Sequence, residues 1–360
     1  MNEEVYRKLA KRLDTLPNGF PATESGVELR LLAKIFSPEE AALAAEMRLR
    51  YETAEEIAAR AGFDPQVAYP LLKGMARKDA IQARRREGQL VFMLLPFVVG
   101  IYEGQLPRMD AELAALAEQY FQEVGGRTIL DAAPPIHRVI PVQEAISFDL
   151  EVFPYERAAA IAESAKSWGV RECICRVQKR AIGQGCDYPL ETCVVLAPVE
   201  NAFPEGGATR SITKEEALGI LRMAEEAGLV HTTGNFRDRH YYICNCCPCC
   251  CAVLRGLTEF NVPTAVARSG FRAAVDEAAC LGCGACVERC HFGALTLPGE
   301  VAVVDPARCL GCGVCTTACP TEALRLERRP DAEVVEPPAS IEEWMLRRAQ
   351  ARGIPLEEIL

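Results

Sequence analysis

Cysteine is the residue type whose number and spacing point most directly to chemistry in this sequence. The chain of 360 residues has 18 cysteines, all between Cys173 and Cys319, whereas residues 1–172 have none. The N-terminal stretch MNEEVYRKLAKRLD is charged and lacks the apolar core of a secretory signal, so we expect a cytoplasmic protein. In that reducing compartment, free thiolates serve metals or redox chemistry rather than structural disulfides.

Eight of the cysteines belong to an internal repeat. Residues 275–297 read VDEAACLGCGACVERCHFGALTL and residues 304–326 read VDPARCLGCGVCTTACPTEALRL, and each copy carries the spacing C-x2-C-x2-C-x3-C. Such short spacings let three thiolates surround one cube of iron and sulfide, and the intervening glycines let backbone amides point at the inorganic sulfur. Structural zinc also accepts four thiolates, but zinc ribbons use two separated C-x2-C pairs.

The two copies resemble the two-cluster bacterial ferredoxin family, in which the fourth cysteine of each run binds the other cluster. The resemblance implies a pseudo-twofold fold of two short hairpins and two helices. It also implies two [4Fe-4S] clusters, one held by Cys280, Cys283, Cys286 and Cys319, the other by Cys309, Cys312, Cys315 and Cys290. The first copy departs from the family by placing His291 where the family has proline. This histidine could tune a cluster potential or be a plain surface replacement.

The other ten cysteines form a second concentration: Cys173, Cys175, Cys186, Cys193, Cys244, Cys246, Cys247, Cys249, Cys250 and Cys251. Six of them lie within CNCCPCCC, residues 244–251, where adjacent thiols would invite oxidation unless several bind metal. We expect at least one further metal site here. One set would be Cys173, Cys175, Cys186 and Cys193, and another would be drawn from residues 244–251.

The identity of that further site stays open at this point. A third [4Fe-4S] cluster, zinc, and redox-active or regulatory thiols all fit the composition. His231 and His240 could add ligands or be structural. The combination CICR, GCDYPLETC, EEAGLVH and ICNCCPCCC resembles a cysteine-rich domain attached to ferredoxin modules in iron-sulfur proteins of anaerobes.

The cysteine-free first part predicts helices followed by a hairpin. A helix is expected over 27–36, a second after the capping box at 53–56, a third over 65–78, and a hairpin over 81–94. This order resembles a winged-helix module. Residues 73–88 carry a net charge of +4 and could contact phosphates, but Pro70 should interrupt the recognition helix. The sequence leaves open whether this module docks on a protein or binds DNA, and docking is favoured.

The remaining sequence supplies the elements that must position the second cysteine group. We expect helices over 110–122, 155–167, 214–227 and 252–257, a strand over 193–196, Pro-rich connectors at 133–141 and 330–338, and a final helix from 340 to about 353. Cys173 is expected to follow a helix.

These patterns predict a multidomain α+β protein. Its parts are a winged-helix-like helical domain (1–109), a helical connector with a central α/β cysteine-rich metal-binding domain (110–270), a ferredoxin-like module with two [4Fe-4S] clusters (271–329), and a linker with a C-terminal helix (330–360). The longest apolar run, residues 90–101, is too short for a membrane span. The net charge of -10 does not favour coating nucleic acid or an anionic membrane.

No G-x-G-x-x-G fingerprint, P-loop, G-x-S-x-G elbow or C-x-x-C-H haem motif occurs, so nucleotide, flavin and haem chemistry have no support in the sequence. No catalytic residue is identified. The sequence predicts an electron carrier, or an electron-transfer subunit, that relays single electrons to or from a partner oxidoreductase. The alternatives are an iron-sulfur redox sensor that binds DNA and a subunit or maturation factor that delivers metal.

Overall fold

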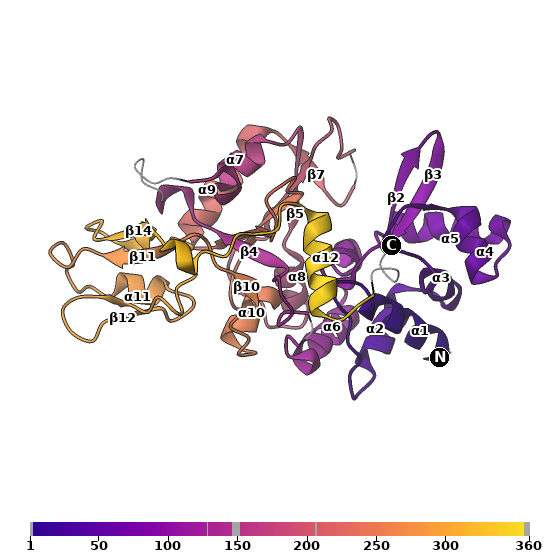
Figure 1. Cartoon of the computed structure of the whole chain (residues 1–360), viewed down its shortest axis with the longest axis horizontal. Coiled ribbons are helices and arrows are strands. Elements are labelled where there is room, and N and C mark those ends of the chain that lie inside the picture. The colour runs from indigo at the N-terminus through magenta and orange to yellow at the C-terminus, as the bar shows by residue number, and fades with distance from the viewer. Residues whose placement is uncertain (1–2, 128, 146–151, 206, 356–360) are drawn as a thin grey trace. The chain divides into compact units, whose positions relative to one another are not determined.

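The computed structural model describes residues 3–127, 129–145, 152–205 and 207–355 of the chain (Figure 1). Helices and strands are mixed along the sequence. Two compact units are present, and each contains distant stretches of the chain. Unit 1 comprises Met1–Ala133, Val177–Gly185 and Met345–Leu360, and unit 2 comprises Pro134–Arg176 and Cys186–Trp344. Two helices, α8 (Ile174–Ala181) and α12 (Ile341–Ala351), continue from one unit into the other.

Unit 1 is mainly helical and holds one small antiparallel sheet with the strand order β1-β3-β2. Its elements are α1 (Glu3–Asp14), α2 (Val27–Ile35), α3 (Pro38–Ala44), β1 (Glu52–Thr53), α4 (Ala54–Ala61), α5 (Pro65–Arg77), β2 (Ile81–Arg86), β3 (Gln89–Leu94), η2 (Glu103–Arg108) and α6 (Ala111–Val124). The expected capping box opens α4, since the Thr53 side chain accepts a hydrogen bond from the Glu56 amide. Gly62 ends α4 in the left-handed region. The predicted order of helix, helix and hairpin is therefore present.

Helix α5 runs through Pro70, contrary to the expectation that this proline interrupts it. A proline inside a helix removes one backbone hydrogen bond and costs about 3 kcal/mol. Three apolar side chains spaced by about one turn, Ala68, Leu72 and Met75, are all fully buried along one side of α5. Packing of this apolar face thus outweighs the local cost, while Pro70 itself is exposed.

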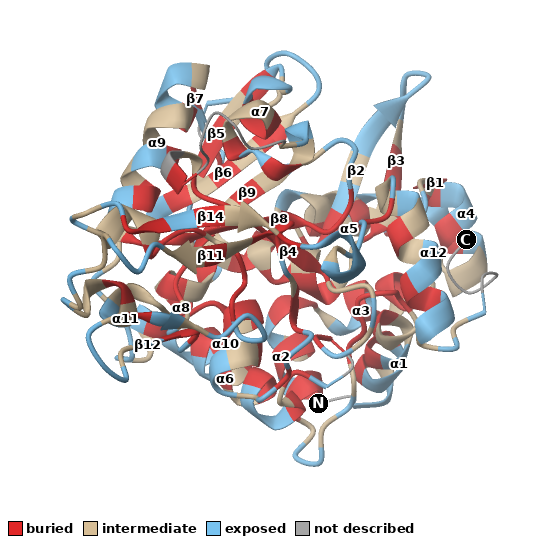
Figure 2. Ribbon diagram, turned by 60° about the vertical axis from the view of Figure 1, so that its left-hand side comes forward, coloured by how far each residue is buried: buried red, intermediate tan, exposed pale blue. Residues whose placement is uncertain are grey.

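Unit 2 is built on a seven-stranded sheet with the order β10-β4-β8-β9-β6-β5-β7. All neighbouring strands are antiparallel except the parallel pair β10 and β4. The strands are β4 (His137–Ile140), β5 (Ser167–Glu172), β6 (Glu191–Ala197), β7 (Arg210–Ile212), β8 (Val230–Gly234), β9 (Tyr242–Cys246) and β10 (Val266–Ala267). The central strands carry many of the buried residues of this unit (Figure 2).

Two expectations for this region were wrong. The Pro-rich stretch 133–141 is not merely a connector, because its HRVI segment forms the fully buried strand β4 between β10 and β8. The helix expected over 155–167 is shorter: the turn η4 (Pro154–Glu156) precedes α7 (Ala158–Glu163), and Ser167 already begins β5. As a result, Cys173 follows a strand rather than a helix. Trp168, Gly169 and Val170 pair with both β6 and β7, and this pairing favours the extended chain.

Helices α7 and α9 (Lys214–Ala227) cover one face of the sheet with apolar side chains. Val170, Val194 and Leu196 from the strands meet Ile161 and Leu221 from the helices in one buried cluster. Strand β8 differs from its neighbours, since all its residues are buried although its sequence, VHTTG, is largely polar. The sheet therefore has a polar interior beside β9, the strand that leads into residues 244–251.

Residues 271–328, called here the eight-cysteine module, form two small antiparallel pairs. Strand β11 (Phe271–Val275) pairs with β14 (Leu324–Arg328), which closes the module end to end, and β12 (Leu295–Thr296) pairs with β13 (Val303–Val304). Helix α11 (Ala285–Arg289) and the turn η5 (Thr316–Ala318) occupy equivalent places in the two copies. The expected pseudo-twofold arrangement is thus recognisable, with one pair formed by the module's ends instead of by a hairpin. The other elements of unit 2 are η3 (Gln143–Ala145), α10 (Ala252–Thr258) and η6 (Asp331–Glu333).

Candidate metal centres

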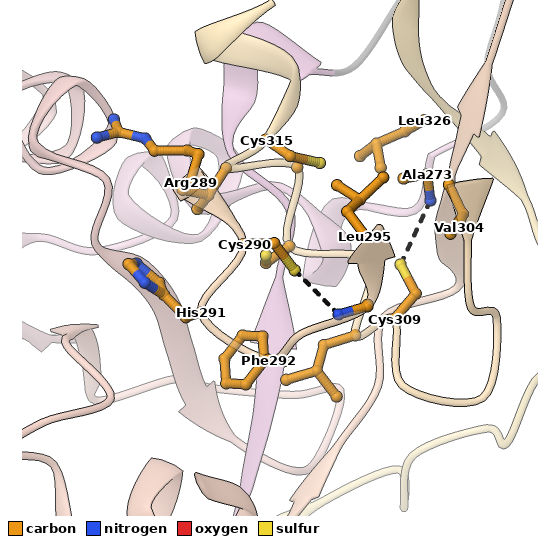
Figure 3. Close-up of a pocket in the computed structure, with 15 residues that line it drawn as sticks. Ala273, Arg289, Cys290, His291, Phe292, Leu295, Val304, Cys309, Cys315 and Leu326 are labelled. Atoms are coloured by element: carbon orange, nitrogen blue, oxygen red, sulfur yellow. Dashed lines mark hydrogen bonds between the residues drawn. The ribbon is translucent and has the colours of Figure 1, made fainter. Parts of the chain in front are cut away.

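One cavity in the eight-cysteine module is lined by four cysteines from both copies of the repeat (Figure 3). These are Cys309, Cys312 and Cys315 of the second copy and Cys290 of the first. Backbone amides already point at two of the sulfurs, because Ala273 N donates to Cys309 Sγ at 3.4 Å and Ala294 N donates to Cys290 Sγ at 3.3 Å. The rest of the lining is mostly apolar, which excludes water from the sulfurs.

A second cavity repeats this arrangement with the roles of the copies exchanged. It is lined by Cys280, Cys283, Cys286 and Cys319 together with apolar residues such as Leu297 and Leu324. Each cavity therefore contains the first three cysteines of one copy and the fourth cysteine of the other. The structure brings together the same two groups of four that the resemblance to ferredoxins groups.

Glycines shape the loops that carry these thiols. Gly311 has a φ of +68°, and a Cβ atom there would lie 2.1 Å from the backbone oxygen of Phe271. Gly282, its counterpart in the first copy, has a φ of +63° and would clash with the Glu300 oxygen at 2.4 Å. A side chain at either position would push the loop away from its neighbouring strand or turn. The Leu-Gly-Cys segment of each copy is thus fixed by close backbone packing.

Burial changes the pKa of several thiols of the module. Burial raises the pKa of Cys312 to about 12 and also raises the pKa of Cys315. Burial likewise raises the pKa of Cys286, whereas backbone hydrogen bonds to the sulfur of Cys319 outweigh burial and lower its pKa. A bound cation would have to displace these protons, so metal binding and thiol deprotonation are coupled here.

The eight-cysteine module is attached to the rest of unit 2 by backbone hydrogen bonds and two basic side chains. Val142 N donates to Cys312 O at 2.9 Å. His291 Nε2 lies 2.7 Å from Gly228 O, just beyond the end of α9, so its ring contacts the sheet domain and is not a plain surface replacement. Arg289 donates to the carbonyls of Glu225 and Glu226 at that same helix end. A cation suits this position because the last carbonyls of a helix carry partial negative charge.

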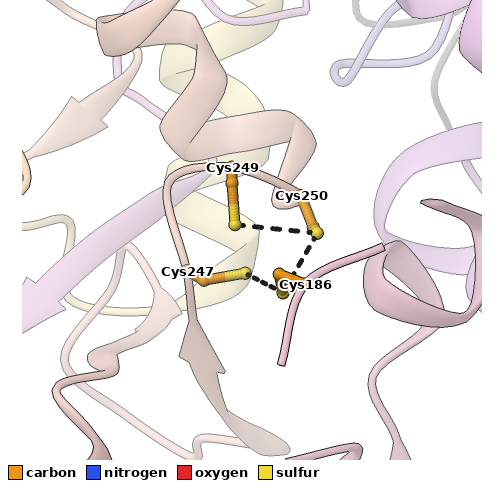
Figure 4. A group of neighbouring side chains, drawn as sticks. All are labelled: Cys186, Cys247, Cys249 and Cys250. Carbon is orange, nitrogen blue, oxygen red and sulfur yellow. Dashed lines mark hydrogen bonds between the residues drawn. The ribbon is translucent and has the colours of Figure 1, made fainter. Parts of the chain in front are cut away.

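A compact group of four thiols lies outside the module (Figure 4). It consists of Cys186, Cys247, Cys249 and Cys250, called here the Cys186 group, whose sulfurs all lie within 4.8 Å of one another. Cys186 Sγ is 3.9 Å from Cys247 Sγ and 3.5 Å from Cys250 Sγ, and Cys249 Sγ is 3.8 Å from Cys250 Sγ. Cys247 and Cys250 are buried, whereas Cys249 is exposed. The group is therefore a candidate metal site near the surface.

The electrostatics of the Cys186 group favour one thiolate in the absence of metal. The hydrogen bond from Cys250 and the charge of Arg176 hold the pKa of Cys247 below its usual value. The same contact with Cys247 raises the pKa of Cys250. A thiolate already present at Cys247 would give an incoming cation its first ligand.

The structure divides the ten cysteines differently from the sets expected from sequence. Cys186 joins Cys247, Cys249 and Cys250, while Cys175 interacts with Cys173 and with Cys251 at the start of α10. Strand β9 ends at Cys246, and Cys247 begins the following turn, where it joins the Cys186 group. Cys175 lies in the first turn of α8, and the rest of this helix lies between it and Cys186 along the chain. Neither the end of β9 nor the length of α8 is visible in the cysteine spacing.

The two histidines near this region have partners other than thiols. His231 is fully buried, with Nδ1 at 2.5 Å from Asn245 Oδ1 and Nε2 at 2.9 Å from Glu225 Oε1. His240 Nδ1 lies 3.1 Å from Thr233 Oγ1, and its ring stacks on Phe236. Both ring nitrogens of His231 are thus engaged in the polar interior of the sheet. The sequence left two roles open for this histidine, metal ligand and structural residue, and its hydrogen bonds favour the structural one.

Comparison with known proteins identifies one part of the chain. Residues 279–323 match the family model of the 4Fe-4S dicluster domain, and this match covers all eight cysteines of the module. The chain therefore contains an iron-sulfur domain. It is an iron-sulfur protein in which a mixed helix and sheet structure precedes that domain. The searches of curated proteins and of solved structures found no match.

Among the described residues, no helix combines the length and the apolar character needed to cross a bilayer.

Proposed function

We propose that this protein transfers single electrons through two [4Fe-4S] clusters held by its eight-cysteine module. The observation that carries the proposal is the pair of cavities, each with three thiols of one copy and the fourth thiol of the other. One cluster would bind Cys280, Cys283, Cys286 and Cys319, and the other would bind Cys309, Cys312, Cys315 and Cys290. Two clusters in one small module favour electron transfer over a structural role, because a single zinc ion would be enough to hold the same loops in place.

The source and the destination of the electrons would be another protein. Iron-sulfur modules of this kind exchange electrons with an oxidoreductase, and no nucleotide or flavin motif provides an internal partner. We therefore propose a redox partner protein and a reducing, cytoplasmic location in which 18 cysteines can stay reduced. The chain would act as a carrier or as an electron-transfer subunit rather than as an enzyme on its own.

The Cys186 group fits a single tetrahedral metal ion better than a third cube. Four thiolates at about 2.3 Å from a tetrahedral zinc ion lie about 3.8 Å from each other. Three of the sulfur separations, 3.5, 3.8 and 3.9 Å, are close to that value, and all the sulfurs lie within 4.8 Å of one another. A cube places an iron and a sulfide edge between its thiolates and spreads them further apart. We propose zinc at Cys186, Cys247, Cys249 and Cys250.

Iron and sulfide analysis with redox titration tests the electron-transfer proposal. The anaerobically reconstituted chain should contain about eight iron and eight sulfide ions and should take up about two electrons at low potential. Substantially fewer than eight iron ions, or iron that cannot be reduced reversibly, would contradict it. A Cys249→Ser variant serves as a control, because its substitution lies in the Cys186 group and should leave the iron content unchanged.

A second candidate function rests on the basic strand β2 of unit 1. Arg84, Arg85 and Arg86 are consecutive on this strand, Arg85 and Arg86 are exposed, and Arg84 stacks on Tyr51 at 3.7 Å. If helices α4 and α5 and the β2–β3 hairpin act as a winged helix, cluster oxidation could regulate DNA binding. Anaerobic gel shifts with genomic fragments, before and after oxidation, test this candidate. Binding that is blind to sequence and lost at moderate salt would exclude it.

A further inference from the structure

A cavity of a different kind lies beside the eight-cysteine module. Its volume is about 450 Å³, and no cysteine is among the described residues that line it. Thr258 and Asn261, at and just after the end of α10, supply part of the lining, and Gly293 and Arg308 of the module supply another part. We call this space the Arg308 cavity. Sites for small molecules measure about 300–1,000 Å³, so the Arg308 cavity is large enough for one.

The Arg308 cavity shares part of its lining with the cavity that holds the cysteines of the second copy. His291, Phe292 and Leu310 line both spaces. His291 and Phe292 directly follow Cys290 in the chain, and Figure 3 shows them beside it. A molecule bound in the Arg308 cavity would therefore lie next to the cluster that we propose for Cys290 and the second copy.

The fixed charges of the Arg308 cavity are positive. Arg268 and Arg308 line it, both are exposed, and no carboxylate is among the described residues of the lining. Arg268 donates to Ala307 O, and Arg308 Nε donates to Phe292 O at 3.0 Å. Each of these bonds uses one nitrogen of a guanidinium. Neither arginine has a carboxylate partner among the described residues, so further N–H groups stay available for a ligand.

The carboxylates that are near this cavity along the chain are engaged elsewhere. Asp305 Oδ1 accepts a hydrogen bond from Ala307 N at 2.8 Å. Glu259, which follows Thr258, pairs with Arg255 at 2.7 Å. Neither carboxylate lines the cavity. The positive charge of the two lining arginines is therefore not neutralised from within the cavity, although the whole chain has a net charge of -10.

The two copies of the repeat provide an internal comparison. Alignment of residues 275–297 with residues 304–326 pairs Ala279 with Arg308 and Leu281 with Leu310. Leu310 is 4% exposed beside the cavity, whereas Leu281 is 72% exposed. The first copy thus has neither the basic side chain nor the covered leucine at this place. Because both copies carry the same four cysteines, the arginine is not part of what the repeat needs to bind a cluster.

We propose that the Arg308 cavity binds a small molecule that carries carboxylate or phosphate groups. Guanidinium groups hold such oxyanions by paired, charge-assisted hydrogen bonds, and a cleft lined by one sign of charge attracts the opposite sign. The hydroxyl of Thr258 and the amide of Asn261 add polar groups to the same lining. A bound anion disfavours adding an electron nearby, so it lowers the reduction potential of the adjacent cluster. This last effect rests on the proposed electron-transfer function, whereas the binding itself does not.

Isothermal titration calorimetry tests the binding on the full chain, prepared without oxygen and with its clusters in place. Inorganic phosphate and succinate are the probes, at low ionic strength because salt screens exposed charges. The wild type should bind at least one of them saturably with one ion per chain, and glycerol should not bind. Tighter binding of phosphate indicates a phosphorylated ligand, and tighter binding of succinate indicates a carboxylic acid. Either preference supports the proposal.

Two substitutions and one matched control locate the bound ion. Arg308→Ala, which gives the second copy the residue of the first, should weaken binding at least about tenfold, because it removes charge-assisted hydrogen bonds. Arg268→Ala should act in the same direction and decides the matter if Arg308→Ala does not fold. Arg325→Ala removes the same charge from an exposed position of β14 outside the cavity and should bind like the wild type.

Three results would overturn the proposal. The first is the absence of saturable binding of either ion by the iron-loaded chain. The second is equal binding by Arg268→Ala, Arg308→Ala and Arg325→Ala. The third is binding of an acidic peptide such as tetraglutamate when neither small ion binds, since the cavity would then serve a protein partner.

Redox titration with and without a saturating concentration of the bound ion gives a readout that a structural arginine would not. The potential of the wild type should fall for one cluster. It should not change in Cys290→Ala, which should keep only the cluster of the first copy. An unchanged potential in the wild type, or an equal change in both proteins, would place the ion elsewhere and overturn the assignment. Loss of iron from the wild type would instead contradict the proposed function, so the two failures are distinguishable.

Discussion

The eight-cysteine module and the region around residues 244–251 solve the same problem, holding reactive thiols, in different ways. In the module each cavity keeps its four thiols apart around an apolar space, and among the described residues no sulfur-sulfur hydrogen bond joins the eight. In the Cys186 group the sulfurs touch at 3.5–3.9 Å. The first arrangement leaves room for a cube, and the second leaves room for one ion. Thiol spacing in space, more than in sequence, therefore separates the two kinds of site.

The largest expected effect comes from removing a cysteine that crosses between the two copies. Cys290→Ala should lose the cluster bound to the second copy, because Cys290 lines the cavity of Cys309, Cys312 and Cys315. Iron should fall from about eight to about four ions per chain. The reduced protein should then show the EPR signal of an isolated cluster without magnetic coupling to a neighbour.

The matched variant Cys319→Ala should lose the opposite cluster and give the same iron content with a different potential. Identical redox titrations of the two variants would argue against ligands that cross between the copies. The zinc content should stay at the wild-type level in both variants, which would show that each substitution affects only the eight-cysteine module.

The next largest effect is expected from a substitution that disturbs the backbone packing of the module. Gly311→Ala forces a Cβ atom into the Phe271 oxygen and a side chain into the left-handed region, so it should destabilise the module by several kcal/mol and reduce cluster occupancy. Gly299→Ala is the control in the same module, since a Cβ there meets nothing within 4 Å. Thermal unfolding and iron content measure both variants. Equal stability of the two would mean that the close approach at Gly311 is not required.

The buried polar residues of the unit 2 sheet, which leads into the cysteine-rich region, predict that the stability of the protein depends on pH. Burial lowers the pKa of His137 from its usual value near 6.5 to about 4. The unfolded chain therefore binds the extra proton first as the pH falls below 6.5, and stability decreases from there toward pH 4. At pH 5.5 the loss amounts to about 1 kcal/mol.

His137→Asn should reduce this acid sensitivity even if it lowers stability at neutral pH. Chemical unfolding of the chain at pH 7.5 and 5.5, compared between wild type and variant, gives the difference. The same pH dependence in both proteins would show that His137 does not titrate as its burial implies.

The smallest expected effect concerns the attachment of the module to α9. Arg289→Ala removes hydrogen bonds to the helix-end carbonyls of Glu225 and Glu226 and should cost about 1 kcal/mol. Arg325→Ala, on the exposed side of β14, should cost much less. Unfolding by denaturant measures the stability of both variants. A larger loss of stability in Arg325→Ala than in Arg289→Ala would contradict the role of Arg289 in attaching the module to α9.

Sequence predicted the module well because the information is local and repeated. The spacing C-x2-C-x2-C-x3-C and the glycines beside it define both copies, and residues 279–323 indeed match a dicluster family. The capping box at Thr53 and the apolar pattern over 214–227 likewise placed the starts of α4 and α9 within a residue or so. Each of these signals lies within a few consecutive residues.

The parts that sequence missed depend on contacts between distant segments. The residues of β4 lie in a Pro-rich stretch, which in the sequence looks like a connector. Pairing with β8 and β10 holds them in the extended conformation. The grouping of Cys186 with Cys247 depends on where β9 ends and on the length of α8. No sequence pattern marks Arg176, which only the structure shows to be fully buried.

Low-temperature EPR of the dithionite-reduced chain, with iron and sulfide counted in the same anaerobic sample, tests the central claim most directly. Two [4Fe-4S] clusters predict about eight iron ions per chain and the broadened signal of two interacting reduced cubes. A colourless chain without iron, or a chain that holds only zinc at the eight cysteines of residues 280–319, would contradict this account of the protein.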